Sequence, residues 1–117
     1  MRLSKSDLAI LLQIKEFLQH EYRYQHTHAS IAKRFQISES KLRKCFSIAY
    51  KISIYKYLVS IRIEKAKGLL ANTDESVKSI ASQVGYDVKS LEKQFKKITG
   101  ISPLKWRNAN SSYQSAY

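Results

Sequence analysis

The chain contains an internal repeat that matches itself without a gap when it is shifted by 49 residues. The tripeptide Ser-Ile-Ala at Ser30–Ala32 recurs at Ser79–Ala81, and nine of the 28 aligned pairs that end at Tyr57 and Trp106 are identical. Ordinary residue usage would give about two identities. The matches fall on apolar, helix-capping and turn positions, so the repeat predicts one structural unit that occurs twice.

Each copy has the pattern of two helices joined by a tight turn. The first helix carries a small residue, Ala32 or Ala81, which lets the second helix pack closely across it. Four residues later comes a turn residue, then an apolar residue that fills the corner, then a helix-capping residue. These positions are Gln36, Ile37 and Ser38 in one copy, and Gly85, Tyr86 and Asp87 in the other. This order is typical of a helix-turn-helix.

Hydrophobic periodicity and capping residues predict an all-α fold of seven helices. The first is expected to run from its cap Ser6 to about Tyr22. The others are expected over residues 28–35, from 39, over 54–71, 77–84 and 88–98, and from 103. The residues expected to face inward from the first helix and from the longest one are Leu8, Leu11, Leu12 and Leu18, and Ile54, Leu58, Ile61, Ala66 and Leu69.

The two helix-turn-helix units of the repeat lie on either side of the long helix expected over residues 54–71. We expect the first subdomain over residues 6–52, a linker helix over 53–71, the second subdomain over 72–108 and a flexible tail over 109–117. The helix of this linker, expected over residues 54–71, has 18 residues, is about 27 Å long and is expected to act as a spacer. Gly68 lies inside it and is expected to mark either close packing or an early end of the helix.

The charge of the chain favours a polyanionic partner. The 117 residues include 21 Lys and Arg against nine Asp and Glu, a formal net charge of +12. Most of the excess lies in residues 33–67 and 78–107, one block for each copy of the repeat. Nucleic acid is the first interpretation. The alternatives are a basic helical interaction domain that binds an acidic protein, and a protein that binds an anionic membrane surface.

Several classes of protein are disfavoured by the sequence. The single cysteine, Cys45, allows neither a disulfide framework nor a Cys-rich zinc site. No apolar run is long enough to span a membrane, and the first residues lack the pattern of a signal peptide. No pairing of a nucleophile with a base, no paired carboxylates and no phosphate loop stand out. We therefore expect an intracellular protein that is not an enzyme and uses no cofactor and no metal.

The chain resembles the DNA-binding region of AraC/XylS-type bacterial transcription regulators from Ser6 to Arg107. The most specific stretches are RIEKAKGLL at Arg62–Leu70, SVKSIASQVGY at Ser76–Tyr86 and LEKQFKKITGISPLKWR at Leu91–Arg107. The resemblance implies a transcription regulator that binds double-stranded DNA sequence-specifically and presents two recognition helices to adjacent segments of the major groove. It further implies a cytoplasmic, nucleoid-associated location, RNA polymerase as a partner and, in many members, a sensor domain outside this region.

The same resemblance implies which residues contact DNA. In the first recognition helix they are Ser40, Lys41, Arg43 and Lys44, and in the second they are Lys89, Ser90 and Lys93. Arg and Lys suit the O6 and N7 acceptors of guanine, and the outward Glu92 is either an acceptor for cytosine N4 or a solvated side chain. Lys51 stands where the family usually has glycine, so the first recognition helix is expected to end differently from the second.

Overall fold

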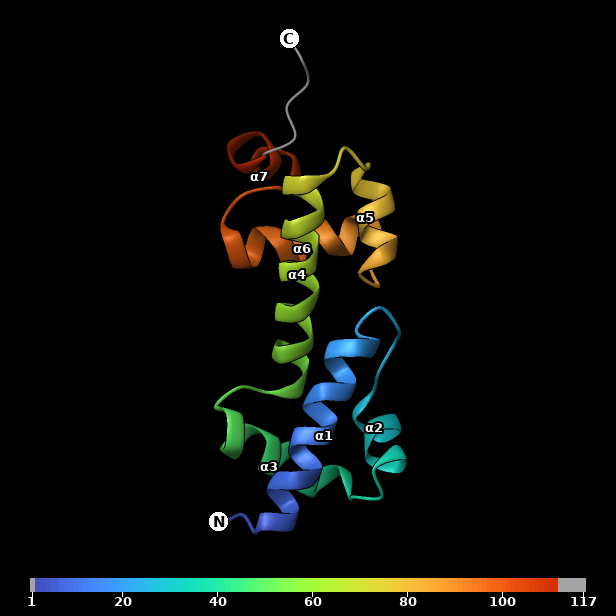
Figure 1. Ribbon diagram of the computed structural model, residues 1–117, viewed down its shortest axis with the longest axis vertical. Helices are drawn as coiled ribbons and strands as arrows, with labels where there is room; N and C mark the ends of the chain where they lie inside the picture. The colour runs from blue at the N-terminus through green and yellow to red at the C-terminus, as the bar shows by residue number, and fades with distance from the viewer. Residues whose placement is uncertain (1, 112–117) are drawn as a thin grey trace. The chain divides into compact units, whose positions relative to one another are not determined.

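The structure, a computed structural model, describes residues 2–111, and within that range it contains seven α-helices and no strand (Figure 1). The chain divides into two compact units between Leu58 and Val59. Helix α4 crosses this division. The helices are α1 (Lys5–Glu21), α2 (His28–Arg34), α3 (Glu39–Tyr50), α4 (Ile54–Asn72), α5 (Val77–Gln83), α6 (Val88–Thr99) and α7 (Pro103–Asn110). The predicted all-α class and the number of helices are confirmed.

Helix α1 begins at a different cap from the expected one. Ser4 takes the place predicted for Ser6: its hydroxyl accepts from the amide of Asp7 at 3.0 Å, and the Asp7 carboxylate accepts from the amide of Ser4 at 3.1 Å. A cap at Ser6 would place Ala9 three residues later, and alanine has no acceptor to complete this reciprocal pair. The prediction of Ser6 was therefore wrong by two residues.

Two predicted apolar faces were partly wrong. In α1 the buried residues are Leu11, Ile14 and Leu18, whereas Leu8 is 45% exposed and Leu12 is 50% exposed. Because α1 has apolar residues on more than one side, periodicity alone did not single out the face that meets the other helices. In α4, Ile61 and Leu69 are half-buried; the buried positions are Ile54, Leu58, Val59, Arg62, Ile63, Ala66 and Leu70.

The first unit packs α3 against both α1 and α2. Phe46 of α3 is fully buried, and its ring lies 4.9 Å from that of Tyr50 and 5.7 Å from that of Tyr57, measured between centroids. The Nε2 of Gln19 in α1 donates to the hydroxyl of Tyr57 at 2.8 Å. These contacts join the end of α3 and the start of α4 to α1.

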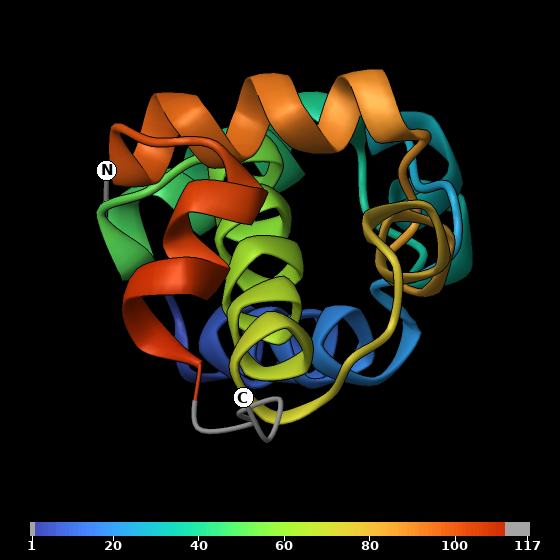
Figure 2. The same ribbon diagram turned by 90° about the horizontal axis from the view of Figure 1, so that it is seen from above.

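In the second unit, α6 packs against α5 and α7. Figure 2 shows α6 running across the C-terminal half of α4, with α5 and α7 on either side of that helix. Leu91 and Phe95 of α6 are fully buried, and the Phe95 ring meets the Trp106 ring edge-on at 5.9 Å. Arg107 of α7 donates to the carbonyls of Leu70 at 3.0 Å, Thr73 at 3.3 Å and Glu75 at 2.6 Å.

Arg62 is a structural residue that the sequence interpretation counted only as part of a basic block. It is 5% exposed, and its guanidinium carbon lies 4.8 Å from the centre of the Tyr86 ring. A guanidinium over an aromatic face is attracted by the ring quadrupole. Tyr86 is the apolar corner residue of the second helix-turn-helix, so this contact connects α4 to that corner.

The two recognition helices end in the same way, which corrects the expectation for the first. Lys51 has φ 58° and donates its amide to Ser47 at 2.9 Å; Gly100 has φ 88° and donates to Lys96 at 2.8 Å. Lys51 therefore adopts the left-handed conformation that glycine adopts in the other copy, at a cost of about 1–2 kcal/mol for a residue with a Cβ.

Gly68 marks neither close packing nor a helix end. Helix α4 continues to Asn72, and a Cβ placed on Gly68 would meet no atom within 4 Å. Residues 109 and 110, which were expected to belong to a flexible tail, lie in α7. Residues 112–117 of that expected tail lie outside the described residues.

We predict that Gly68→Ala raises the free energy of unfolding by about 1 kcal/mol, because alanine restricts the unfolded chain and favours a helix interior. Urea unfolding followed by circular dichroism measures this. The matched control is Gly100→Ala, which places a Cβ at φ 88° and should lower the free energy of unfolding by about 1–2 kcal/mol. A destabilising Gly68→Ala would contradict the open surroundings of that residue.

Acid should destabilise the chain partly through the N-cap Asp87. The Ser90 amide, at 2.7 Å, holds the pKa of the Asp87 carboxyl below its ordinary value of 3.8. A carboxyl with a lowered folded-state pKa stabilises the fold above its unfolded pKa, and this contribution is lost as the pH falls through the folded pKa. Asp87→Asn keeps a capping side chain without the titration. We predict that this variant loses less stability than the parent between about pH 5 and pH 2, whereas identical acid profiles would contradict it.

Candidate nucleic-acid interface

Both copies of the repeat form the same turn. In the first unit the amide of Ile37 donates to the carbonyl of Ala32 at 3.0 Å, and in the second the amide of Tyr86 donates to that of Ala81 at 2.9 Å. The preceding turn residues, Gln36 and Gly85, have φ 55° and 91°. Ala32 and Ala81, the small residues of the first helices, are both buried. Each unit therefore contains a helix-turn-helix: α2–α3 in the first and α5–α6 in the second.

Helix α3 presents a polar face opposite its buried one. Ser38 caps the helix by accepting from the amide of Lys41 at 3.1 Å, which sets the register of the turns that follow. Leu42, Cys45 and Phe46 are buried. The four residues predicted to contact DNA from this helix are all exposed: Ser40, Lys41, Arg43 and Lys44.

Two of these four side chains are paired with carboxylates. Lys41 Nζ lies 3.0 Å from the Oδ1 of Asp7 in α1, and Arg43 lies 3.5 Å from the Oε1 of Glu39, one turn earlier in α3. The amide of Ser4 and the Lys41 ammonium lower the pKa of the Asp7 carboxyl, and the hydrogen bond to Asp7 raises the pKa of Lys41. Lys41 is thus tied to α1, whereas Lys44 forms no ion pair with the described residues.

Helix α6 presents four exposed lysines together with the exposed Glu92. Lys89 and Lys93 are exposed, and so are Lys96 and Lys97 on the following turn. None of these four lysines forms a salt bridge with a carboxylate in residues 2–111. Ser90 is half-buried, and its amide donates to the capping carboxylate of Asp87. The structure thus brings Lys89 and Lys93 to one exposed surface and places Ser90 at the edge of it.

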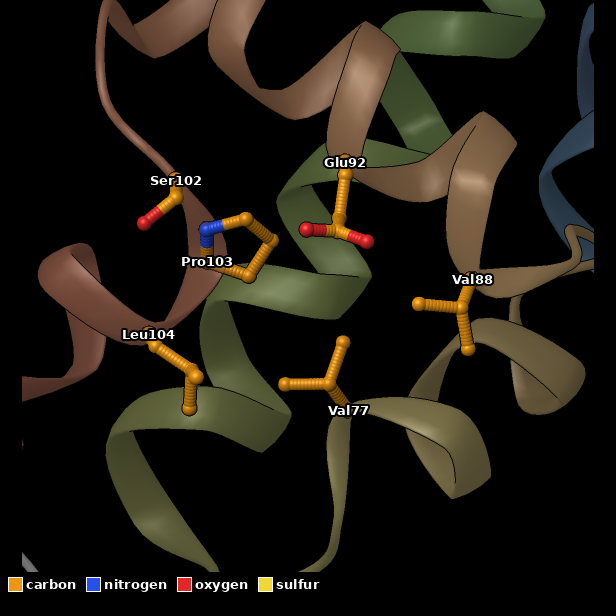
Figure 3. A pocket seen from close by; sticks show the side chains of 6 residues that line it. All are labelled: Val77, Val88, Glu92, Ser102, Pro103 and Leu104. Atoms are coloured by element: carbon orange, nitrogen blue, oxygen red, sulfur yellow. The ribbon is translucent and has the colours of Figure 1, made fainter.

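One pair of aligned positions in the repeat carries residues of opposite charge. Arg43 of α3 aligns with Glu92 of α6. Glu92 lies beside a pocket of about 170 Å³, whose other lining residues are Val77, Val88, Ser102, Pro103 and Leu104. Figure 3 shows the Glu92 carboxylate pointing into this largely apolar pocket. Glu92 therefore belongs to the surroundings of the pocket, which sequence reasoning did not identify.

The described part of the chain contains neither a metal-binding cluster nor a helix suited to spanning a membrane. Within residues 2–111 no group of three or more His, Cys, Asp and Glu side chains is placed to hold a metal ion. Cys45 is buried on the same face of α3 as Leu42 and Phe46. In the same range, no helix combines the length and the hydropathy that crossing a bilayer requires.

Two helix-turn-helix units, each with a basic exposed second helix, define a nucleic-acid-binding domain. The comparison with protein families agrees, since the profile described as "Helix-turn-helix domain" matches residues 31–109. The chain belongs to this family, the AraC-type helix-turn-helix domains of transcription regulators.

Similar proteins include regulators from several bacteria. The Msm operon regulatory protein of Streptococcus mutans is 31% identical over 105 residues, which are 89% of this chain and 38% of that protein. The raffinose operon transcriptional regulatory protein RafR of Pediococcus pentosaceus is 34% identical over 94 residues, 80% of this chain and 34% of that protein. The chain thus spans little more than a third of the length of these two relatives.

Solved structures share the fold over nearly all of the chain. The C-terminal domain of AraT, a response regulator from Geobacillus stearothermophilus, superposes with a TM-score of 0.87 at 28% identity and covers 100% of this chain and 97% of that one. The DNA-binding domain of AdpA, solved with a target DNA, superposes with a TM-score of 0.81 at 23% identity, covering 85% of this chain and 90% of that one.

We predict that Arg43→Ala relaxes sequence preference at one or two base positions and costs about 1–3 kcal/mol of specific binding, because a guanidinium can donate to both major-groove acceptors of guanine. Affinities for a preferred duplex and for its single-base variants measure this. Lys5→Ala removes an exposed lysine at the start of α1 and should change little. Equal weakening of every sequence by both substitutions would show that Arg43 does not read bases.

Proposed function

We propose that the chain binds double-stranded DNA sequence-specifically, as the DNA-binding part of a transcription regulator, and that α3 and α6 each enter a major-groove segment. The observation that carries this proposal is the pair of exposed basic faces on the second helices of two helix-turn-helix units. In such units the second helix lies in the major groove and its N-terminal residues reach the base edges. The membership of the chain in the AraC-type family supports the same assignment.

The candidate contacts differ in chemistry between the two helices. On α3, Arg43 and Lys44 are the candidates for guanine O6 and N7, and Ser40 can donate to or accept from any base edge. Lys41 is a candidate for a phosphate, once it leaves Asp7. On α6, Lys89 and Lys93 are the cationic candidates, and Ser90 is a weaker one because it is half-buried.

The linker expected over residues 53–71 and the two subdomains on either side of it are part of the proposal. Helix α4 is continuous from Ile54 to Asn72, which supports a linker without a break. We infer that the two recognition helices read adjacent major-groove segments of one site. A monomer would then have no need of a palindromic site, in contrast to a dimer with one recognition helix in each subunit.

Partners and location follow from the same assignment. RNA polymerase is the proposed protein partner, a sensor domain is the proposed source of regulation, and the bacterial cytoplasm, at the nucleoid, is the proposed location. The naming of two similar proteins as operon regulators supports these inferences. No enzymatic activity is proposed, in keeping with a family of transcription regulators.

Salt dependence of DNA binding tests the proposed function. The logarithm of the affinity should fall linearly with the logarithm of the salt concentration, by about 0.9 for each phosphate neutralised. The double substitution Lys89→Gln and Lys93→Gln should reduce the slope by up to about two, since each lysine against the duplex contributes about one. Lys5→Gln is the matched control with an unchanged slope.

Two results would contradict the proposed function. A slope near zero would exclude a binding surface made of cations and phosphates. The second contradicting result is that duplexes selected from a random pool bind no more tightly than a scrambled duplex. Binding would then be non-specific, which would favour a basic domain whose partner is an acidic protein.

A further inference from the structure

Glu39 is an unexpected residue at the tip of a helix that meets a polyanion. It is the first residue of α3, on the part of a recognition helix that comes nearest to base edges. Its side chain is 48% exposed, and its Oε1 lies 3.5 Å from the Arg43 guanidinium, whose side chain is 60% exposed. The carboxylate therefore accompanies the principal candidate for guanine recognition.

The second copy of the repeat lacks this pair. Val88 of α6 occupies the slot of Glu39, and Glu92 occupies the slot of Arg43. Lys89 of α6 attracts the capping carboxylate of Asp87, but no lysine of α6 forms a salt bridge with a carboxylate in the described chain. An acid combined with a guanidinium on the exposed face therefore occurs in α3 and has no counterpart at the same slots of α6.

A carboxylate on this face weakens most encounters with DNA. Phosphates repel it, and the acceptors at guanine O6 and N7, adenine N7 and thymine O4 offer it no hydrogen bond. Glu39 also offsets part of the charge of Arg43, which weakens the attraction of that guanidinium to a phosphate. The amino group at cytosine N4 is the major-groove donor that a carboxylate suits best. Discrimination grows when a group that binds one partner also penalises the others.

We propose that Glu39 is a specificity-determining residue of α3, whose carboxylate accepts from a cytosine amino group beside the guanine read by Arg43 and weakens binding wherever that cytosine is absent. This proposal rests on the proposed function, since it assigns a base preference to the same surface. It differs from the resemblance-based assignment, which places no acidic residue among the contacts of α3.

The test compares Glu39→Gln with Glu64→Gln by selection from a random duplex pool and by affinity for the selected and scrambled duplexes. Glu64 lies on α4 and pairs with Lys67 at 3.1 Å, so its substitution removes the same charge away from α3. Both glutamates are exposed, and circular dichroism verifies that both variants remain folded.

Glu39→Gln should tighten binding to scrambled DNA and reduce the ratio of specific to non-specific affinity by about tenfold, within the range of one base contact. At one position the preference for cytosine should disappear or shift to adenine, because a glutamine amide both accepts and donates and so matches adenine N6 and N7. The guanine preference assigned to Arg43 should persist. Glu64→Gln should leave the selected sequence and the ratio unchanged.

The proposal is overturned if both variants change the ratio equally, since the effect would then be one of net charge. It is also overturned if Glu39→Gln leaves the selected bases and the ratio unchanged. These outcomes differ from a failure of the proposed function, in which the parent chain itself would enrich no sequence from the pool.

Discussion

The structure depends on the close crossing of two helices at each helix-turn-helix. The first helix of each unit contributes a buried alanine, Ala32 or Ala81, and the chain then reverses through a residue with positive φ. The backbone hydrogen bond across each turn closes the corner at 3.0 or 2.9 Å. Because the crossing fixes the rotation of the second helix about its axis, it decides which residues of α3 and α6 are buried and which remain exposed to a partner.

The two helix-turn-helix units share a backbone arrangement, but the exposed faces of α3 and α6 differ in charge. In α3 the exposed cations stand beside the carboxylates of Asp7 and Glu39, whereas the lysines of α6 form no such ion pair with the described residues. Attraction between lysines and phosphates is independent of sequence and dominates affinity, and base edges are distinguished by directional hydrogen bonds. We infer that both helices contact base edges, that the lysines of α6 add most to the affinity for DNA, and that α3 adds most to discrimination between sequences.

The parts of the fold that local rules determine were predictable from the sequence. Ser38, Ser53, Ser76, Asp87 and Ser102 each accept from an amide three residues later, as caps should. The helices that follow them begin at the residues expected from the sequence. Arg43, Lys44, Lys89 and Lys93, which the resemblance placed against DNA, are all exposed. The contribution of these residues to DNA binding remains a prediction.

The features that sequence reasoning missed arise from contacts between distant segments. Nothing local shows that Arg62 lies against the Tyr86 ring, or that Arg107 donates to carbonyls more than 30 residues earlier in the chain. The burial of Ile14 instead of Leu8 and Leu12 likewise depends on where α3 packs. The left-handed conformation of Lys51 was not expected, because a residue with a Cβ adopts it at a cost of about 1–2 kcal/mol. The packing of a whole unit can offset a cost of this size.

Methylation interference on the selected duplex tests the central claim, that α3 and α6 read DNA through the major groove. Methyl groups at guanine N7 lie in the major groove and those at adenine N3 lie in the minor groove. The account predicts that N7 methylation blocks binding at guanines in two separate segments, and that Arg43→Ala removes the interference in one of them. Interference confined to adenine N3, or none at any guanine of the site, would contradict it.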